Sequence, residues 1–430
     1  MPILLRLLGS LAVIVLVNAW SRSLTIATLV GTVVFALWCG HPLWGSVDGS
    51  APIPVIAWQA LVDPDNLLLA LTIFLLLWMS SLMASCGVMT ELVVAVRARI
   101  GPRWAMAALP AVIGWLPMPG GAAFSAPMVN ECDHQQQLPS IAKSVANYWF
   151  RHVWEYWWPL YPGVLLAISL TGLPMWLFVL TMLPLSLASI VVGRLTVLPR
   201  LAVADEQPDA TPGGAGFLSL ILPILVTVLL AAGLGSLVPG LAELNRYLPM
   251  VIGLIVGLMV LAYQRSIDAG QWRRVLLAPS TLGLVVLVLV IQIYGAFIRV
   301  PLPDGQPVSA VIRDELTRWG ISPLAMVVLI PAAMGLVTGI CIGFVGASFP
   351  VVLALMANDS SLGQQLSTAV LAYGAGYLGM LLSPVHVCLV VSNAYFKTSL
   401  YISIRLLLVP VTAMAVFVVG YWAVLRWGCG

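Results

Sequence analysis

The most regular feature of the chain is a series of long apolar stretches without charged residues, separated by short polar segments. Their apolar positions follow helical spacing rather than the short alternating segments of a transmembrane β-barrel. A helix needs about 20 mostly apolar residues to cross a membrane. The pattern predicts an all-α polytopic membrane protein with about ten spanning helices, over residues 3–19, 24–40, 66–89, 145–170, 174–198, 217–237, 246–264, 275–298, 365–396 and 401–424.

Two apolar stretches do not fit as single spans. Residues 104–130 are uncharged but too short for two crossings, and the sequence Pro117-Met118-Pro119-Gly120-Gly121 interrupts them. A continuous helix does not accommodate these prolines, and irregular backbone at membrane depth is stable only inside protein or beside water. A re-entrant hairpin of two half-helices is therefore predicted here, and a second one over residues 323–357.

The two hairpins belong to a longer repeat. Pro110 and Gly114 of the first hairpin match Pro331 and Gly335 of the second at one sequence offset. In each copy a spanning helix and a short charged arm precede the hairpin, and an interrupted helix follows it. The arms are residues 91–103 and 309–320, and the interrupted helices contain Trp158-Pro159-Leu160-Tyr161-Pro162 and Leu382-Ser383-Pro384-Val385-His386.

The distribution of arginine predicts opposite orientations for the two copies. The loop 265–274 holds three Arg and should be cytoplasmic. Counting helices from this loop places the first arm inside and the second arm outside, so the repeats are inverted. The predicted organisation is a scaffold of N-terminal helices (1–64), a first inverted repeat (65–198), a cytoplasmic linker (199–216), connecting helices (217–274) and a second inverted repeat (275–430).

Composition excludes several classes of protein. The chain is 61% hydrophobic and 8% charged, which no soluble domain of this length tolerates. The net charge of +3 includes no basic run, so a nucleic-acid partner is not expected, and the six Cys form no C-x-x-C pair that would suggest a metal site. The four His are scattered without clustered Asp, so we expect no enzymatic activity. No cofactor is expected beyond a coupling Na⁺ or H⁺.

The breaks themselves provide candidate chemistry. Each break creates a half-helix whose free backbone N–H groups and positive dipole end favour an anion. Ser383 and Pro384 have the residue types of an N-cap followed by the first helical position. The alternative interpretation of the glycines is close helix packing. The predicted substrate-binding residues are Pro119, Gly120, Gly121, Ser125, Gly343, Gly346, Ser348 and Ser383.

Few ionisable residues lie within the apolar stretches, and such residues are costly to bury in a membrane. Arg151 and Glu155 are four residues apart and would share one helix face. They either serve substrate or coupling-ion binding or form a structural ion pair. His386 either relays protons or packs as a neutral side chain. A cation antiporter needs a buried carboxylate, for which Glu155 is the one good candidate, so an anionic substrate is favoured.

These motifs also carry a family resemblance. The sequences Leu116-Pro117-Met118-Pro119-Gly120-Gly121-Ala122 and Gly343-Phe344-Val345-Gly346-Ala347-Ser348-Phe349-Pro350, with both interrupted-helix motifs, resemble the bacterial and archaeal membrane family called domain of unknown function 401. That family is grouped with the ion-transporter superfamily of secondary carriers. The resemblance implies inverted repeats, paired hairpins, commonly a homodimer, and elevator-like alternating access. The family has no assigned function, so the resemblance brings no substrate. The tips lack the Ser-Asn-Thr signature of the dicarboxylate symporters, so neither dicarboxylate specificity nor sodium coupling follows from it.

The sequence therefore favours a secondary active transporter that moves a small organic or inorganic anion across the cytoplasmic (inner) membrane, with the lipid bilayer as its surroundings. The alternatives are a cation or proton antiporter that uses Glu155, and an uncoupled channel or exporter of the same fold.

Overall fold

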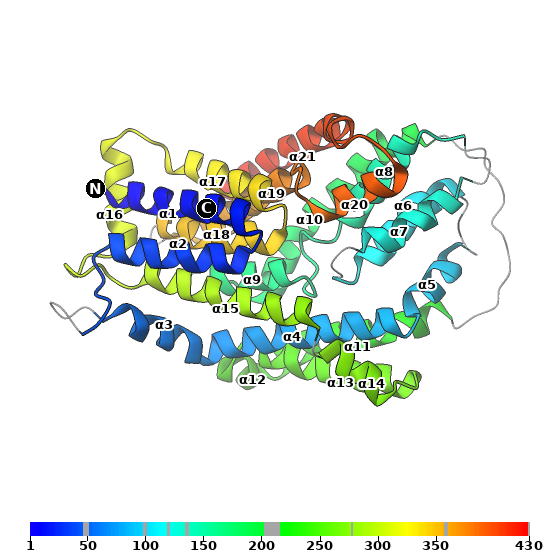
Figure 1. Ribbon diagram of the computed structural model, residues 1–430, viewed down its shortest axis with the longest axis horizontal. Coiled ribbons are helices and arrows are strands. Elements are labelled where there is room, and N and C mark those ends of the chain that lie inside the picture. Colours follow the sequence, from blue (N-terminus) through cyan, green and yellow to red (C-terminus); the bar gives the residue numbers. More distant parts are fainter. Residues whose placement is uncertain are drawn as a thin grey trace.

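The computed structural model is built of α-helices, most of which run along the long axis of the molecule (Figure 1). It describes residues 1–45, 51–97, 100, 102–117, 121–133, 137–201, 216–276, 278–356 and 360–428. The predicted linker 199–216 falls mostly outside these residues.

Each of the ten predicted spans corresponds to one helix or to a pair of helices separated by a break. Six described helices are long and apolar enough to cross a membrane: α1 (Ile3–Ser21), α4 (Pro64–Ser85), α10 (Met175–Thr196), α11 (Phe217–Leu237), α15 (Pro279–Arg299) and α21 (Leu400–Gly428). Two others are the shorter helices α2 (Leu24–Trp38) and α13 (Leu248–Gln264). The last two are broken into the pairs α8 (Ser140–Arg151) with α9 (Pro162–Thr171) and α19 (Leu362–Leu381) with α20 (Val387–Phe396). The chain is a multi-pass membrane protein.

Both predicted hairpins are pairs of packed half-helices. The first consists of α6 (Pro102–Gly114) and α7 (Ala122–Glu131), and the second of α17 (Pro323–Thr338) and α18 (Cys341–Leu355). The arms before them are α5 (Val88–Arg97) and α16 (Val308–Arg318). The second arm meets its hairpin at a bend of 110°. Figure 1 shows α5 and α16 at opposite ends of the helical bundle.

The helices pack in two groups. One group, here called the outer group, contains α1, α2, α4, α11, α13 and α15 with the short helices α3 (Ile53–Val62), α12 (Pro239–Leu244) and α14 (Ala269–Leu276). The other, here called the hairpin group, contains both hairpins, both broken helices, α10 and α21. The 3-10 turn η1 (Leu198–Arg200) follows α10.

Ionic contacts fix the arms to the outer group. The guanidinium of Arg265, just after α13, donates two hydrogen bonds of 2.6 and 2.7 Å to the carboxylate of Glu91 on α5. This partner lowers the pKa of Glu91 below its ordinary value. At the other end, both carboxylate oxygens of Glu315 on α16 accept backbone N–H groups of Ile3 and Leu4 at 2.7 Å. Glu315 therefore caps the N-terminus of α1, where a negative charge is favoured.

A buried ion pair holds the first hairpin against the first broken helix. The Lys143 ammonium lies 2.9 Å from an Asp133 carboxylate oxygen, and both side chains are 2% exposed. Burial alone would raise the pKa of Asp133, but the hydrogen bonds from Lys143 and from the amides of Leu138 and Gln137 lower it overall. Lys143 also donates to the Asn130 side chain at 2.9 Å, so the pair fixes the turn between α7 and α8.

Candidate substrate site

The two broken helices meet at their breaks, through a reciprocal pair of hydrogen bonds. The Tyr148 hydroxyl on α8 donates to the Leu381 carbonyl at the end of α19, at 3.1 Å. The Tyr377 hydroxyl on α19 donates to the His152 carbonyl at the end of α8, at 2.5 Å. Both donors and both acceptors are related by the same sequence offset. Each break leaves carbonyls without helical partners, and each half of the chain supplies a tyrosine to the other.

The hairpins dock onto the broken helices in matching ways. A Cβ on Gly114 would lie 2.2 Å from the Arg151 carbonyl oxygen, and one on Gly335 would lie 2.0 Å from the Gly376 carbonyl oxygen. Both glycines therefore allow backbone-to-backbone contact between a hairpin and the broken helix of its own half. The sequence match of Gly114 with Gly335 thus corresponds to equivalent packing.

Side chains of each break also reach the adjoining hairpin. The Trp158 indole donates to the Trp115 carbonyl at 3.0 Å, and the Ser383 hydroxyl donates to the Leu336 carbonyl at 2.6 Å. Trp115 and Leu336 are related by the offset that relates Gly114 to Gly335. Each hairpin's first half-helix thus ends against the break of its own half.

Arg151 brings a buried positive charge to the first hairpin tip. It is the last residue of α8 and is 3% exposed. A Cβ on Gly121 would lie 2.1 Å from its Nη2 atom and 2.5 Å from its Cζ atom. Gly121 is the N-cap of α7, so the guanidinium lies against the N-terminal end of that half-helix. The negative dipole end at the C-terminus of α8 stabilises this cation. The N-terminal end of α7 that faces it is itself positive.

Two histidines connect the breaks. The Nε2 atoms of His152 and His386 are 3.0 Å apart, and these residues are 2% and 5% exposed. His152 Nδ1 lies 2.6 Å from the Tyr148 carbonyl oxygen. A Glu155 carboxylate oxygen lies 3.8 Å from His152 Nε2. Glu155, His152 and His386 thus form a row of titratable side chains from one break to the other.

The second hairpin tip joins the same cluster. Gly339 ends α17 with φ +63°, where glycine is favoured. A Cβ there would lie 2.9 Å from the His386 amide nitrogen and from Ser383 Oγ. Cys341, just past the tip, contacts Gly163 at the start of α9. Contacts thus run from the first tip through Arg151, His152 and His386 to the second.

Comparison with known families matches residues 4–425 to a family described as "Protein of unknown function (DUF401)". The chain belongs to the DUF401 family. No curated protein matches it. Among solved structures, the YdaH transporter of Alcanivorax borkumensis, reported to have an unusual topology, is similar with a TM-score of 0.60. The two are 15% identical over 96% of this chain and 97% of that one. At this identity the likeness shows the fold alone.

Not all of the predicted substrate-binding residues lie at the hairpin tips of the DUF401 chain. Pro119 and Gly120 lie outside the described residues. The hydroxyls of Ser125 and Ser348 bond to carbonyls of their own helices, the latter to Phe344 at 2.6 Å. Gly346 lies within α18, where a Cβ would meet Ile291 of α15, and Gly343 packs against Thr338. Of the predicted set, Gly121 and Ser383 have contacts at the breaks.

Two sequence predictions about the breaks were wrong. Arg151 and Glu155 do not share a helix face, because α8 ends at Arg151 and the following residues form turns. Glu155 contacts His152 instead. Ser383 is not an N-cap, because α20 begins at Val387 with His386 as its N-cap. The Ser383 hydroxyl accepts from the Val385 amide at 3.3 Å within the break itself.

Sequence analysis missed His152, Cys388 and Gly339 as site residues. Donor atoms of His152, His386 and Cys388 lie within 4.8 Å of one another, an arrangement that a metal ion could use. Cys388 also interacts with the Arg151 guanidinium, which opposes a bound cation. The 3.0 Å separation of the imidazole nitrogens is a hydrogen-bond length. We therefore interpret the cluster as a hydrogen-bonded network rather than a metal centre.

Proposed function

We propose that this DUF401 chain is a secondary active transporter that moves a small anion across the cytoplasmic membrane by elevator-like alternating access. The observation that carries the proposal is the buried Arg151 guanidinium against the first hairpin tip, where the two breaks meet. A buried charge at membrane depth is costly and is usually kept for function. An anion bound beside Arg151 would lie close to its positive charge.

Helix ends strengthen the preference for an anion. The half-helix α7 begins beside Arg151, and α20 begins at Val387 with His386 as its N-cap, next to the same cluster. The N-termini of both half-helices offer backbone N–H groups and a positive dipole end. Anion binding by helix ends and a guanidinium is the usual way to hold a carboxylate, sulfate or phosphate group in a site with few charged side chains.

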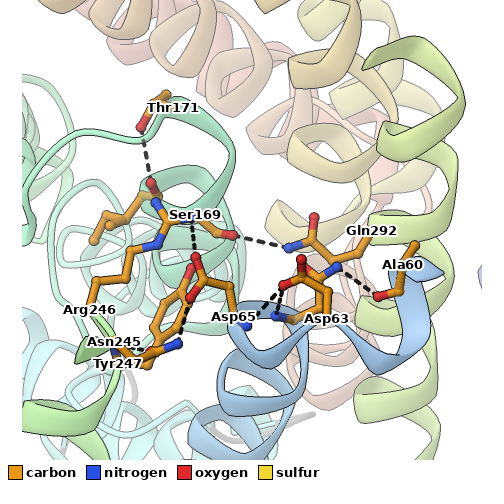
Figure 2. Close-up of polar contacts among 11 residues, drawn as sticks. Ala60, Asp63, Asp65, Ser169, Thr171, Asn245, Arg246, Tyr247 and Gln292 are labelled. Carbon is orange, nitrogen blue, oxygen red and sulfur yellow. Dashed lines mark hydrogen bonds and ion pairs between the residues drawn. The ribbon is translucent and has the colours of Figure 1, made fainter. Parts of the chain in front are cut away.

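The packing of the helices supports movement of the hairpin group as a unit. The outer and hairpin groups are each internally packed, and α15 of the outer group contacts α18. Polar contacts across this boundary include the bond from Gln292 of α15 to Ser169 of α9 at 3.1 Å and the bond from Ser80 of α4 to the Pro117 carbonyl at 3.3 Å. Figure 2 shows the former beside the cluster of Asp65, Asn245 and Arg246 at the ends of outer-group helices. Gln292 is 3% exposed, so movement of α9 would break a buried hydrogen bond.

Inverted repeats explain how such a unit could face both sides. The arms lie at opposite ends of the bundle, and equivalent residues of the two halves make equivalent contacts at the breaks. In a carrier built of inverted repeats, exchanging the conformations of the halves converts one open side into the other. We therefore interpret 65–198 and 275–430 as the two repeats, with the arms as connections that remain with the outer group.

Uptake by proteoliposomes tests the proposal. The purified protein is screened for thermal stabilisation by chloride, sulfate, phosphate, methanesulfonate and succinate, and uptake of the most stabilising anion is measured. We expect saturable uptake that Arg151→Ala reduces and His41→Gln leaves unchanged, because His41 is buried elsewhere, beside Phe297. Non-saturable flux in both directions would instead indicate a channel.

A cation or proton antiporter that uses Glu155 remains the second candidate. The observation in its favour is the contact between the Glu155 carboxylate and His152. The charge-swapped variant Arg151→Glu with Glu155→Arg separates the two functions. An anion site cannot tolerate a carboxylate in place of the guanidinium. Retained anion uptake by the swapped variant would contradict the anion site and favour the antiporter.

A further inference from the structure

The proposed anion site assigns no role to the pair of histidines where the two breaks meet. We propose that His152 and His386 together bind the proton that drives transport, so that one proton moves with each monovalent anion. This inference rests on the proposed anion transport and adds its coupling ion.

The geometry defines where the pair holds its protons. A carbonyl only accepts, so His152 donates from Nδ1 to the Tyr148 carbonyl oxygen at 2.6 Å. In the neutral form His152 Nε2 then has a lone pair, and the contact of 3.0 Å requires His386 to donate from its own Nε2. His386 Nδ1 is the remaining basic atom of the pair. This buried atom accepts no hydrogen bond from nitrogen or oxygen in the described part of the chain, and the Cys388 thiol is the neighbour that interacts with the His386 side chain.

An additional proton would therefore enter at His386 Nδ1 and make the pair a cation, hydrogen-bonded across Nε2 to Nε2. The titratable and charged side chains around the pair are Tyr148 and Arg151 on α8, Glu155 in the first break, Tyr377 on α19 and Cys388 on α20. Glu155 favours this cation and Arg151 opposes it.

A bound anion would change the net charge around the histidine pair so that the protonated pair is favoured. With the site empty and Glu155 ionised, the charges of Arg151 and Glu155 cancel when the histidine pair is neutral. A monovalent anion beside Arg151 leaves one net negative charge, which is costly at membrane depth. One proton on the pair restores neutrality. Anion and proton thus favour each other's binding, and this reciprocity is the thermodynamic requirement for coupled transport.

The pair also travels with the site. His152 is the C-cap of α8 and His386 is the N-cap of α20, and both half-helices belong to the hairpin group. Hydrogen bonds from Tyr148 and Tyr377 join the same two broken helices. Movement of the unit therefore does not separate the histidines, and a proton bound on one side would be released on the other.

The experiment measures anion and proton movement together in proteoliposomes that contain a trapped pH-sensitive dye. The probe is whichever of chloride, sulfate, phosphate, methanesulfonate and succinate gives saturable uptake. For a monovalent probe we expect its entry to acidify the lumen, and a gradient of one pH unit to drive about tenfold accumulation, since tenfold corresponds to one proton over one pH unit.

The variants separate coupling from binding. His386→Gln keeps a hydrogen-bonding side chain but cannot titrate, so pH-driven accumulation should be lost while exchange of internal for external anion continues. His41→Gln, which alters a buried histidine of the outer group, should retain both. Uptake without proton movement, or pH-driven accumulation by His386→Gln, would overturn the coupling and leave anion transport intact. Failure of all five anions to enter would overturn the proposed transport itself.

Discussion

Gly121→Ala tests how closely the first hairpin tip and Arg151 depend on each other. Gly121 has φ −57° and ψ −15°, so alanine meets no backbone strain there. Its methyl group would lie 2.1 Å from Nη2 and 2.6 Å from Nη1 of Arg151. Carbon and nitrogen atoms cannot approach so closely, so the buried guanidinium must move. The substitution therefore displaces a charge without removing it.

The expected effect follows from the contact that is lost. A hydrogen bond to a charged group contributes about 1.5–3 kcal/mol, so an anion that bonds to Arg151 should bind roughly 10- to 150-fold more weakly. The assay is titration of the most stabilising anion by calorimetry in nanodiscs. Gly233→Ala is the matched control, because Gly233 lies in α11 with no atom within 4 Å of its added Cβ. That control should bind normally.

A double-mutant cycle identifies the cause. If Gly121→Ala acts by moving the guanidinium, it should add little to the effect of Arg151→Ala, which removes the clashing group. Fully additive losses would refute this reasoning, because the tip would then act on the anion independently of Arg151. Normal binding by Gly121→Ala alone would show that the guanidinium does not contact the anion.

Two further predictions concern the ion pairs. Lys143→Met leaves Asp133 buried without its cation and should destabilise the protein by about 3–5 kcal/mol. The double variant Lys143→Met with Asp133→Asn should recover part of this loss. Equal thermal stability of the single and double variants in detergent would contradict this prediction. Glu91→Gln removes a partly exposed pair and should cost no more than about 1 kcal/mol at neutral pH. Because the folded pKa of Glu91 is lowered, this contribution is present above its unfolded pKa and is lost as pH falls through the folded value. The difference between wild type and Glu91→Gln should therefore vanish in acid, and a difference that persists there would contradict the pair.

Helix positions could be predicted from sequence because uncharged apolar stretches and prolines act locally. Pro162 begins α9 at its first helical position, where the missing N–H costs nothing. The breaks could not be predicted in detail, because tertiary contacts set them. Arg151 ends its helix against the first hairpin, so the four-residue spacing of Arg151 and Glu155 does not place them on one helix face. The partnership of His152 with His386 joins positions 234 residues apart, which local patterns do not report.

The predictions for the glycines were likewise correct for some positions and wrong for others. Gly114 and Gly335 were matched by sequence and proved equivalent in packing, because both serve a contact that each half repeats. Gly346 was expected at the second tip, but it packs against Ile291, and Gly339 with its positive φ forms the turn instead. A Thr-Gly pair at the end of an apolar helix is a usual helix stop, and this signal was available at Thr338 and Gly339.

The central claim is that the hairpin group moves against the outer group during transport. An ideal Cβ on Gly346 lies 2.7 Å from Cγ1 of Ile291, so Cβ atoms at these positions are near the separation of about 3.5–4.5 Å that a disulfide spans. In the variant Ile291→Cys with Gly346→Cys, we predict that oxidation abolishes uptake of the selected anion and that reduction restores it. Ile291→Cys alone should be insensitive to oxidation. Undiminished uptake by the fully cross-linked protein would contradict the account.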